Sequence, residues 1–414
     1  MLKIWIISAF VLFTMMIQST YAEPILTDKD FVVQKYVSGF CCGSTSMAFE
    51  GNDILVLERI HGKVRLVRDG VLQEKPVLDE NVNGTGEQGM LGITTVGNKV
   101  YLYFTESEYD GGPPLGKRVY SYDWTGQELT NKTLVKDLPQ TRSYHNGGAM
   151  ITDLNGSVYL VVGDAGRYGK LQNHRQGEPD DTSVILRITP SGPYYAMGIR
   201  NSFGLAVDLV TGELWDTENG VNSFDEINFV QSNFNSGWDV IMGPANETQL
   251  AKLPGYPGYA YHNPQFSWEQ PAAPTGLVFI NSEPFEKYRN DLFVLDCING
   301  NLYRFELNQD RDAFVFNSPQ LSDNVANVGE SMDEIIFGTG FGCATDIEAG
   351  PDGLLYIVSH SDGAIYRIIP KSMVSESIID INSAGVHYAV YIAYAAIAAA
   401  VVSIVIFRKR LIKH

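Results

Sequence analysis

Short apolar segments separated by turns run along most of the chain, from residue 31 to residue 369. Their apolar residues alternate with polar ones or form brief unbroken runs, and glycine, asparagine or aspartate stands between neighbouring segments. Both patterns are typical of β-strands joined by tight turns. The 40 glycines and 22 tyrosines, with few long periodic helical stretches, also favour β structure. We therefore expect an all-β fold for this part of the chain.

One sequence phrase recurs six times within it. Each copy has a small or glycine-rich start, an apolar strand, a turn, a second strand, a polar elbow and a third strand. The copies begin at residues 39, 86, 144, 200, 273 and 340. Their spacing of roughly 45 to 70 residues suits four-stranded propeller blades. The repeat thus predicts a six-bladed β-propeller.

The ring also has a candidate for its closure. The sixth copy ends at Ile369 after three strands, while residues 31–37 (FVVQKYV) precede the first copy and alternate like an edge strand. We expect this segment to supply the missing outer strand of the sixth blade. The alternative is an array of hairpins in two sandwich domains, but no Pro- or Ser-rich linker divides the repeats.

An apolar segment flanks the repeats on each side. Residues 1–22 carry Lys3, a long apolar run and small residues at the end, which predicts a cleaved secretory signal peptide, with an uncleaved anchor as the alternative. Residues 386–407 are apolar and long enough to span a bilayer at about 1.5 Å per residue, and RKR follows them. A buried soluble helix is the alternative for this second segment.

The expected organisation follows from these two segments. It comprises a signal peptide (1–22), a propeller ectodomain (23–375), a juxtamembrane linker (376–385), a transmembrane helix (386–407) and a cytoplasmic tail (408–414). We therefore expect a single-pass protein of the cell membrane with its propeller on the extracytoplasmic side.

The distribution of charge excludes one class of partner. The chain carries a net charge of −18, and its two apolar ends hold five basic residues and no acid, so the body between them carries −23. Such an acidic surface repels phosphate backbones. Nucleic acid is therefore not an expected partner.

Polar residues recur where a propeller would bring them together. The starts of the inner strands and the elbows of all blades gather at one mouth of the central channel. The elbow carboxylates expected there are Glu58, Glu106, Asp164, Glu218 and Asp296. With His145, His360 and Arg200 nearby, such a mouth would shift pKa values and favour a bound cation.

The four cysteines fall at the same mouth. Cys41 and Cys42 open the first copy, Cys297 lies at the elbow of the fifth, and Cys343 lies at the start of the sixth. A disulfide among them, placed to staple the closure of the ring, is the first interpretation. A soft-metal site completed by His360 and free thiols are the alternatives.

The run GIRNSFGLAVDLVTGELWDTENGVNSFDEINFVQSNFNSGW, residues 198–238, resembles the signature of the glucose/sorbosone dehydrogenase family. Residues 138–166 and the sequence GEQGMLG resemble two further passages of that family. The likeness spans about residues 40 to 368. It implies a six-bladed propeller that binds pyrroloquinoline quinone (PQQ) and calcium at the channel mouth and oxidises sugars.

The resemblance also implies roles for single residues. His145 falls on the general base that takes the proton of the anomeric hydroxyl, and imidazole suits this task near neutral pH. Arg200 and Asn201 fall on residues that contact the quinone oxygens. Gly220 and Val221 fall on positions whose carbonyls hold the calcium beside the cofactor. A satisfied surface histidine and an ion pair of Arg200 with a mouth carboxylate are the alternatives.

Other matched positions concern charge and a second metal. Asp225 and Glu226 lie where the family has a structural calcium, although solvated acidic residues are the plainer alternative. Glu87 replaces the family's glutamine at a cofactor-binding position, which adds negative charge. The three basic residues that hold the carboxylates of PQQ are replaced here by Ile298, Cys343 and Thr345. Cofactor binding is therefore expected to be weak unless Arg142, Arg167 or Lys170 compensates.

Two functions from different classes remain. The first is a membrane-tethered sugar (aldose) dehydrogenase that uses PQQ and calcium and passes electrons to an external acceptor. The second is a non-catalytic propeller of the same family that binds a carbohydrate, metal or protein partner. A calcium-dependent hydrolase or lactonase is a third, weaker hypothesis.

Overall fold

The computed structural model describes residues 23–41, 43–138, 142–166, 169–173 and 179–374. The signal peptide, linker, transmembrane helix and tail expected from the sequence lie outside these residues. Within the described ranges, no helix is both long enough and apolar enough to cross a membrane. Membrane anchoring therefore stays a prediction.

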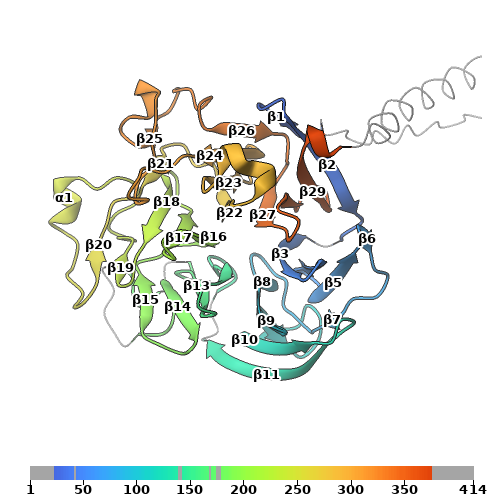
Figure 1. The fold of residues 1–414 in the computed structure, drawn as a ribbon. Coiled ribbons are helices and arrows are strands. Elements are labelled where there is room, and N and C mark those ends of the chain that lie inside the picture. The colour runs from blue at the N-terminus through green and yellow to red at the C-terminus, as the bar shows by residue number, and fades with distance from the viewer. Residues whose placement is uncertain (1–22, 42, 139–141, 167–168, 174–178, 375–414) are drawn as a thin grey trace, which may run out of the picture.

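The described residues form six mostly antiparallel sheets around a central axis, named blades 1 to 6 in chain order of their innermost strands (Figure 1). Each sequence repeat supplies the three inner strands of one blade. Blade 1 contains β3 (Ser44–Glu50), β4 (Asp53–Glu58), β5 (Lys63–Arg68), β6 (Val71–Leu72) and β7 (Leu78–Asp79). Blade 2 contains β8 (Met90–Val96), β9 (Lys99–Ser107), β10 (Pro114–Trp124) and β11 (Leu129–Leu138). Blade 3 contains β12 (Met150–Thr152), β13 (Val158–Val162), β14 (Val184–Thr189), β15 (Tyr194–Met197), β19 (Phe234–Asn235) and β20 (Ala260–Tyr261).

The other three blades follow the same plan. Blade 4 contains β16 (Ser202–Val207), β17 (Leu214–Glu218), β18 (Asp225–Val230), β21 (Phe266–Trp268) and β25 (Val325–Ala326). Blade 5 contains β22 (Pro274–Phe279), β23 (Leu292–Asp296), β24 (Asn301–Phe305), β26 (Ile336–Thr339) and β1 (Ile25–Leu26). Blade 6 contains β27 (Ala344–Ala349), β28 (Leu355–Ser359), β29 (Ala364–Pro370) and β2 (Phe31–Ser38). The described helices are short and lie in loops: α1 (Glu247–Leu250), η1 (Glu283–Tyr288), η2 (Pro319–Leu321) and η3 (Lys371–Met373).

The innermost strands form a closed ring. In order, β3, β8, β12, β16, β22 and β27 each contact the next, and β27 contacts β3. The strands approach so closely that a Cβ atom at Gly92 would lie 2.1 Å from the carbonyl oxygen of Gly148, and one at Gly204 would lie 2.1 Å from that of Thr275. Only glycine fits such an approach. The predicted all-β propeller is confirmed.

The N-terminal segment closes the ring as expected. β2 pairs antiparallel with β29, with Val32 opposite Ile369, and is the outermost strand of blade 6. A second attachment was not expected from the sequence: Ile25 of β1 pairs with Thr339 of β26 in blade 5. The N-terminal strands β1 and β2 therefore attach to blades 5 and 6, whose other strands come late in the chain.

The apolar core lies between neighbouring blades. The middle strands β4, β13, β23 and β28 are buried along nearly their whole length because each has a blade on both faces. The largest cluster joins blades 1, 5 and 6 and centres on aromatic side chains such as Phe31, which stacks on Phe285 at 4.9 Å between ring centroids. This packing explains why these strands read as unbroken apolar runs.

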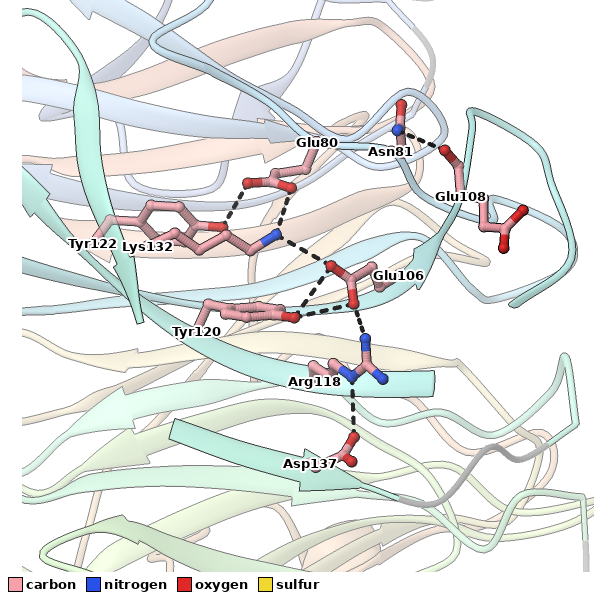
Figure 2. Close-up of polar contacts among 9 residues, drawn as sticks. All are labelled: Glu80, Asn81, Glu106, Glu108, Arg118, Tyr120, Tyr122, Lys132 and Asp137. Carbon is pink, nitrogen blue, oxygen red and sulfur yellow. Dashed lines mark hydrogen bonds and ion pairs between the residues drawn. The ribbon is translucent and has the colours of Figure 1, made fainter. Parts of the chain in front are cut away.

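A charged network covers part of blade 2 (Figure 2). The Lys132 ammonium binds Glu80 Oε2 at 2.7 Å and Glu106 Oε1 at 3.2 Å, and Glu106 also binds Arg118 and the Tyr120 hydroxyl. Burial would raise the pKa of Glu106, but these hydrogen bonds outweigh burial and hold the pKa below its usual value. The charge of Glu106 is thus neutralised by Lys132 and Arg118. The expectation that Glu106 is one of the carboxylates that attract a cation to the channel mouth is therefore wrong.

Candidate functional site

His145 sits in the loop that leads into β12. Its backbone has φ of 55°, a conformation uncommon for a residue with a side chain. Two hydrogen bonds hold it there: its N–H donates to Glu87 Oε2 at 2.7 Å, and its carbonyl accepts from the Ala165 N–H at 3.2 Å. Its side chain is 18% exposed, so the ring is held by the protein but reachable from the mouth.

Asp164 determines the proton position on this imidazole. It follows β13, is fully buried, and its Oδ1 lies 2.6 Å from His145 Nδ1. A carboxylate oxygen only accepts hydrogen bonds, so Nδ1 carries the proton and Nε2 carries the lone pair. The pair therefore presents His145 Nε2 as a base.

Arg200 lies on the other side of the ring. Its Nη2 is 3.0 Å from His145 Nε2, its Nη1 donates to the Asn219 carbonyl at 2.5 Å, and its backbone N–H donates to Glu218 Oε1 at 2.6 Å. Its Nε is buried and has no hydrogen-bond partner among the described residues. Burial lowers the pKa of the guanidinium, although nearby carboxylates oppose this. The result is a fixed cation beside the base.

Asn201 and Glu87 complete this side of the mouth. Asn201 Oδ1 accepts from the Gly147 N–H at 3.1 Å, and its Nδ2 donates to Glu87 Oε2 at 3.3 Å. Glu87 therefore binds both Asn201 and the backbone of His145. The structure brings together all four residues that the sequence assigned to the base and the quinone end: Glu87, His145, Arg200 and Asn201.

Two of the four residues expected to hold calcium, Asp225 and Glu226, accept hydrogen bonds from backbone N–H groups. Gly220 and Val221 lie in the loop between β17 and β18. Asp225 accepts from the N–H groups of Gly220 at 2.7 Å, Ala272 at 2.8 Å and Ala273 at 2.7 Å. Glu226 accepts from the Gly243 N–H. Across the described residues, no group of three or more His, Cys, Asp or Glu side chains is placed to hold a metal, so calcium stays a prediction.

A disulfide joins Cys297 and Cys343, which confirms one bond among the four cysteines. It links the elbow after β23 in blade 5 to the start of β27 in blade 6. The sequence suggested a disulfide at the joint between blades 6 and 1, but this bond joins blades 5 and 6 instead. Cys41 lies at the joint between blades 6 and 1, and Cys42 is outside the described residues. Because Cys297 and Cys343 are oxidised, they cannot contribute thiolates to a soft-metal site.

A quinone with three carboxylates fits one end of this mouth better than the other. Beside His145, the Asn201 amide and the Arg200 Nε, which has no hydrogen-bond partner among the described residues, are groups that bind anionic or carbonyl oxygens. Across the mouth stand the disulfide, Ile298, which is 63% exposed, and Thr345, whose hydroxyl donates to the Ser44 carbonyl at 3.2 Å. Of the basic residues that could compensate, Arg167 lies outside the described residues. The quinone end thus fits, whereas the carboxylate end offers no cation at these three positions.

The sequence missed three residues of the site. Asp164 was expected at the mouth but given no role, and Gln172 and Trp238 were not singled out. Both donate to Asp164 Oδ2, at 3.0 and 2.7 Å respectively. Trp238 stands at the end of the signature run, so a signal existed, but its contact 74 residues away could not be inferred from spacing.

Comparisons with known proteins show to which family the chain is similar. The sequence profile described as "Glucose / Sorbosone dehydrogenase" matches residues 44–367. "Aldose sugar dehydrogenase YliI" of Escherichia coli (strain K12) is 27% identical over 314 residues, covering 69% of this chain and 78% of that protein. "Quinoprotein glucose dehydrogenase B" of Acinetobacter calcoaceticus is 27% identical over 257 residues, 51% of each chain.

Solved structures show the same fold. The apo form of the soluble aldose sugar dehydrogenase from Escherichia coli has a TM-score of 0.65 at 20% identity and covers 82% of this chain and 100% of that one. The PQQ-bound aldose sugar dehydrogenase from Streptomyces coelicolor has a TM-score of 0.60 at 21% identity and covers 82% and 98%. With a family match over most of the propeller, the resemblance seen in the sequence is confirmed: the chain belongs to the glucose/sorbosone dehydrogenase family and is an oxidoreductase of that family.

Proposed function

We propose that the protein is an aldose dehydrogenase that uses PQQ, with His145 as the general base. The observation that carries the proposal is the position of the His145 ring between Asp164 Oδ1 at 2.6 Å and Arg200 Nη2 at 3.0 Å. This arrangement keeps a neutral imidazole with its lone pair on Nε2, next to a fixed positive charge. Oxidation of an alcohol carbon needs both features.

Each group has a defined task in this reaction. The anomeric C–H leaves as a hydride while the anomeric O–H gives its proton to His145 Nε2, and the sugar becomes a lactone. Asp164 stabilises the imidazolium that forms. Arg200, which donates to Nε2 in the structure, would give up this bond to the sugar hydroxyl and stabilise developing negative charge at the quinone end of the site. When bound, the quinone accepts the hydride.

The cofactor would be held mainly at one end. Arg200 and Asn201 would bind the quinone oxygens, and the backbone carbonyls of Gly220 and Val221 would hold a calcium ion. Each charge-assisted hydrogen bond missing at Ile298, Cys343 and Thr345 costs about 1.5 to 3 kcal/mol. We therefore expect weaker PQQ binding than in a site with three basic residues.

The cellular setting follows from the sequence. A cleaved signal peptide and one C-terminal transmembrane helix would place the propeller on the outer side of the cell membrane, where an external acceptor takes the electrons. Protease added to intact cells would then digest the propeller but leave a tag on the C-terminal tail protected.

The test uses the full chain in detergent, titrated with PQQ in the presence and absence of calcium while the quinone absorbance is followed. An aldose and a dye acceptor are then added. The proposal expects calcium-dependent binding and sugar-driven bleaching that His145→Ala abolishes. His262→Ala is the matched control, because His262 is exposed beside β20 at the outer edge of blade 3. Absence of binding at micromolar PQQ would refute the proposal.

One observation favours a second function. The Cys297–Cys343 disulfide and the exposed Ile298 occupy the part of the mouth where carboxylates would need cations. A non-catalytic propeller that binds a carbohydrate, a metal or a protein would tolerate these residues. The same titration separates the two functions, because this one predicts no bleaching by any aldose.

A further inference from the structure

We propose that Trp238 and Gln172 are positioning residues that fix the carboxylate of Asp164 and, through it, the proton position on His145. The inference rests on the proposed function for its effect on turnover. Its effect on the imidazole can be measured without any cofactor.

Each oxygen of the Asp164 carboxylate has its own donors. Oδ1 faces His145 Nδ1 and accepts from the Gly166 N–H at 2.8 Å. Oδ2 accepts from Trp238 Nε1 at 2.7 Å and Gln172 Nε2 at 3.0 Å. A buried carboxylate is stable as an ion only when donors surround it. These two side chains therefore favour the ionised form and prevent the carboxylate from rotating.

Trp238 is itself held in place by the backbone. Its N–H donates to the Gly198 carbonyl at 3.1 Å, and its carbonyl accepts from both the backbone N–H and the side-chain Nδ2 of Asn173, each at 2.8 Å. The residue is 4% exposed. The indole N–H thus points at Asp164 from a rigid position rather than from a mobile loop.

The same indole also positions the second partner of His145. The guanidinium carbon of Arg200 lies over the Trp238 ring, 5.4 Å from its centroid. A cation over an aromatic face is stabilised, and more so when it is buried. Trp238 therefore touches Asp164 with its edge and Arg200 with its face, so one ring sets both neighbours of the imidazole.

Gln172 supplies the second donor from a different segment. It is fully buried, and its backbone carbonyl accepts from the Tyr256 hydroxyl at 3.1 Å. Trp238 and Gln172 together form a clamp on the Asp164 carboxylate. The neighbour of Gln172, Asn173, binds the Trp238 carbonyl, so the two clamp residues are connected. Removal of either donor leaves Oδ2 with a weaker set of bonds and lets the carboxylate turn away from Nδ1. The Nε2–H form of His145 then becomes populated, and in that form Nε2 cannot accept a proton.

The experiment compares three variants of the full chain. Trp238→Phe removes the indole N–H and keeps an aromatic ring, and Gln172→Met removes the amide donor at similar size. Trp215→Phe is the matched control: Trp215 is fully buried in β17, and its Nε1 has no hydrogen-bond partner among the described residues. The first readout is the tautomer of His145 in cofactor-free protein with ¹⁵N-labelled histidine, identified among the seven histidines by its loss in His145→Ala. The second readout is kcat and KM for an aldose.

The proposal expects a native His145 in the Nδ1–H form, a detectable Nε2–H fraction in W238F and Q172M, and native behaviour in W215F. It expects kcat to fall about tenfold in each clamp variant, which corresponds to about 1.4 kcal/mol, with KM within about twofold of native. Folded W238F and Q172M that keep the native tautomer and kcat overturn the proposal. If W238F does not fold, Q172M decides the question by the same readouts.

Failure of the clamp and failure of the proposed function give different results. If the native chain oxidises no aldose with PQQ and calcium, the proposed function fails, and the tautomer comparison still tests the clamp. If the native chain is active but the clamp variants match W215F, only the clamp fails.

Discussion

Replacement of Asp164 by asparagine would reverse the hydrogen-bonding direction at the centre of the site. Trp238 Nε1 and Gln172 Nε2 both donate toward the Oδ2 position, so the amide oxygen of the new side chain must face them. Its NH₂ group must then face His145 Nδ1. The imidazole is forced to accept at Nδ1, and its proton moves to Nε2.

The cost of this reversal can be worked from the contacts. The Gly166 N–H, now 2.8 Å from Oδ1, would face the amide NH₂, and Arg200 Nη2, now 3.0 Å from Nε2, would face an N–H. A buried donor left without an acceptor costs about 1 to 3 kcal/mol. The reversed arrangement leaves these two donors unpaired, so D164N should lose about 4 kcal/mol of unfolding free energy. Its kcat should fall by more than about tenfold, because the Nε2–H form of His145 cannot accept a proton.

The assay is steady-state turnover of an aldose with PQQ, calcium and a dye acceptor, together with the tautomer of His145. Asp181→Asn is the control, because Asp181 binds Tyr194 and Lys136 at the outer part of blade 3, away from His145. A D164N variant that folds and keeps kcat within about tenfold of native would contradict this prediction, because the Nε2–H form of His145 has no lone pair to accept the proton.

Three further predictions concern stability and use denaturant unfolding. The Cys297–Cys343 bond spans a sequence separation of 46 residues, so the double serine variant should lose about 4 kcal/mol of unfolding free energy. Native protein in reductant should show the same loss. A loss below about 1 kcal/mol would show that the disulfide does not stabilise the fold by closing this loop. Burial raises the pKa of Glu218 to about 7, so the native state binds more protons than the unfolded state between about pH 4.5 and 7. Glu218 should therefore contribute a loss of about 3 kcal/mol as pH rises through this window. Glu218→Gln should reduce the slope without abolishing it, because burial also raises the pKa of Asp346 to about 7; an unchanged slope would show that Glu218 contributes nothing. Phe31→Ala should cost about 3 to 5 kcal/mol because the ring is buried in the blade 5 and 6 core, whereas Val71→Ala, at a 59% exposed position, should be nearly neutral; equal effects would contradict the packing.

The sequence predicted the propeller well because its evidence is local. Strands, turns and repeats can be recognised within each copy, and residues 31–37 carry their own alternation. β1 could not be found this way, because Ile25 and Leu26 are too few to show a pattern and their partners lie more than 300 residues away.

The site was only partly predictable for the same reason. His145, Arg200 and Asn201 stand in recognisable runs, and the structure joins them. Trp238 was part of the signature, but its role depends on Asp164, which lies 74 residues earlier in the sequence. Glu106 illustrates the opposite error, because the cations that neutralise it come from neighbouring strands that the sequence does not align.

The two attachments of the N-terminal segment have a consequence for biosynthesis. Val32 of β2 pairs with Ile369 of β29, more than 300 residues later, so one of the first two strands to be made waits for the last. At about 5 to 20 residues per second, this wait lasts on the order of 20 to 70 s. During that time β1 and β2 are already synthesised, whereas their partners β26 and β29 are not. An unpaired strand is exposed to pairing with other chains, so the nascent protein is most open to aggregation before its last blade is complete.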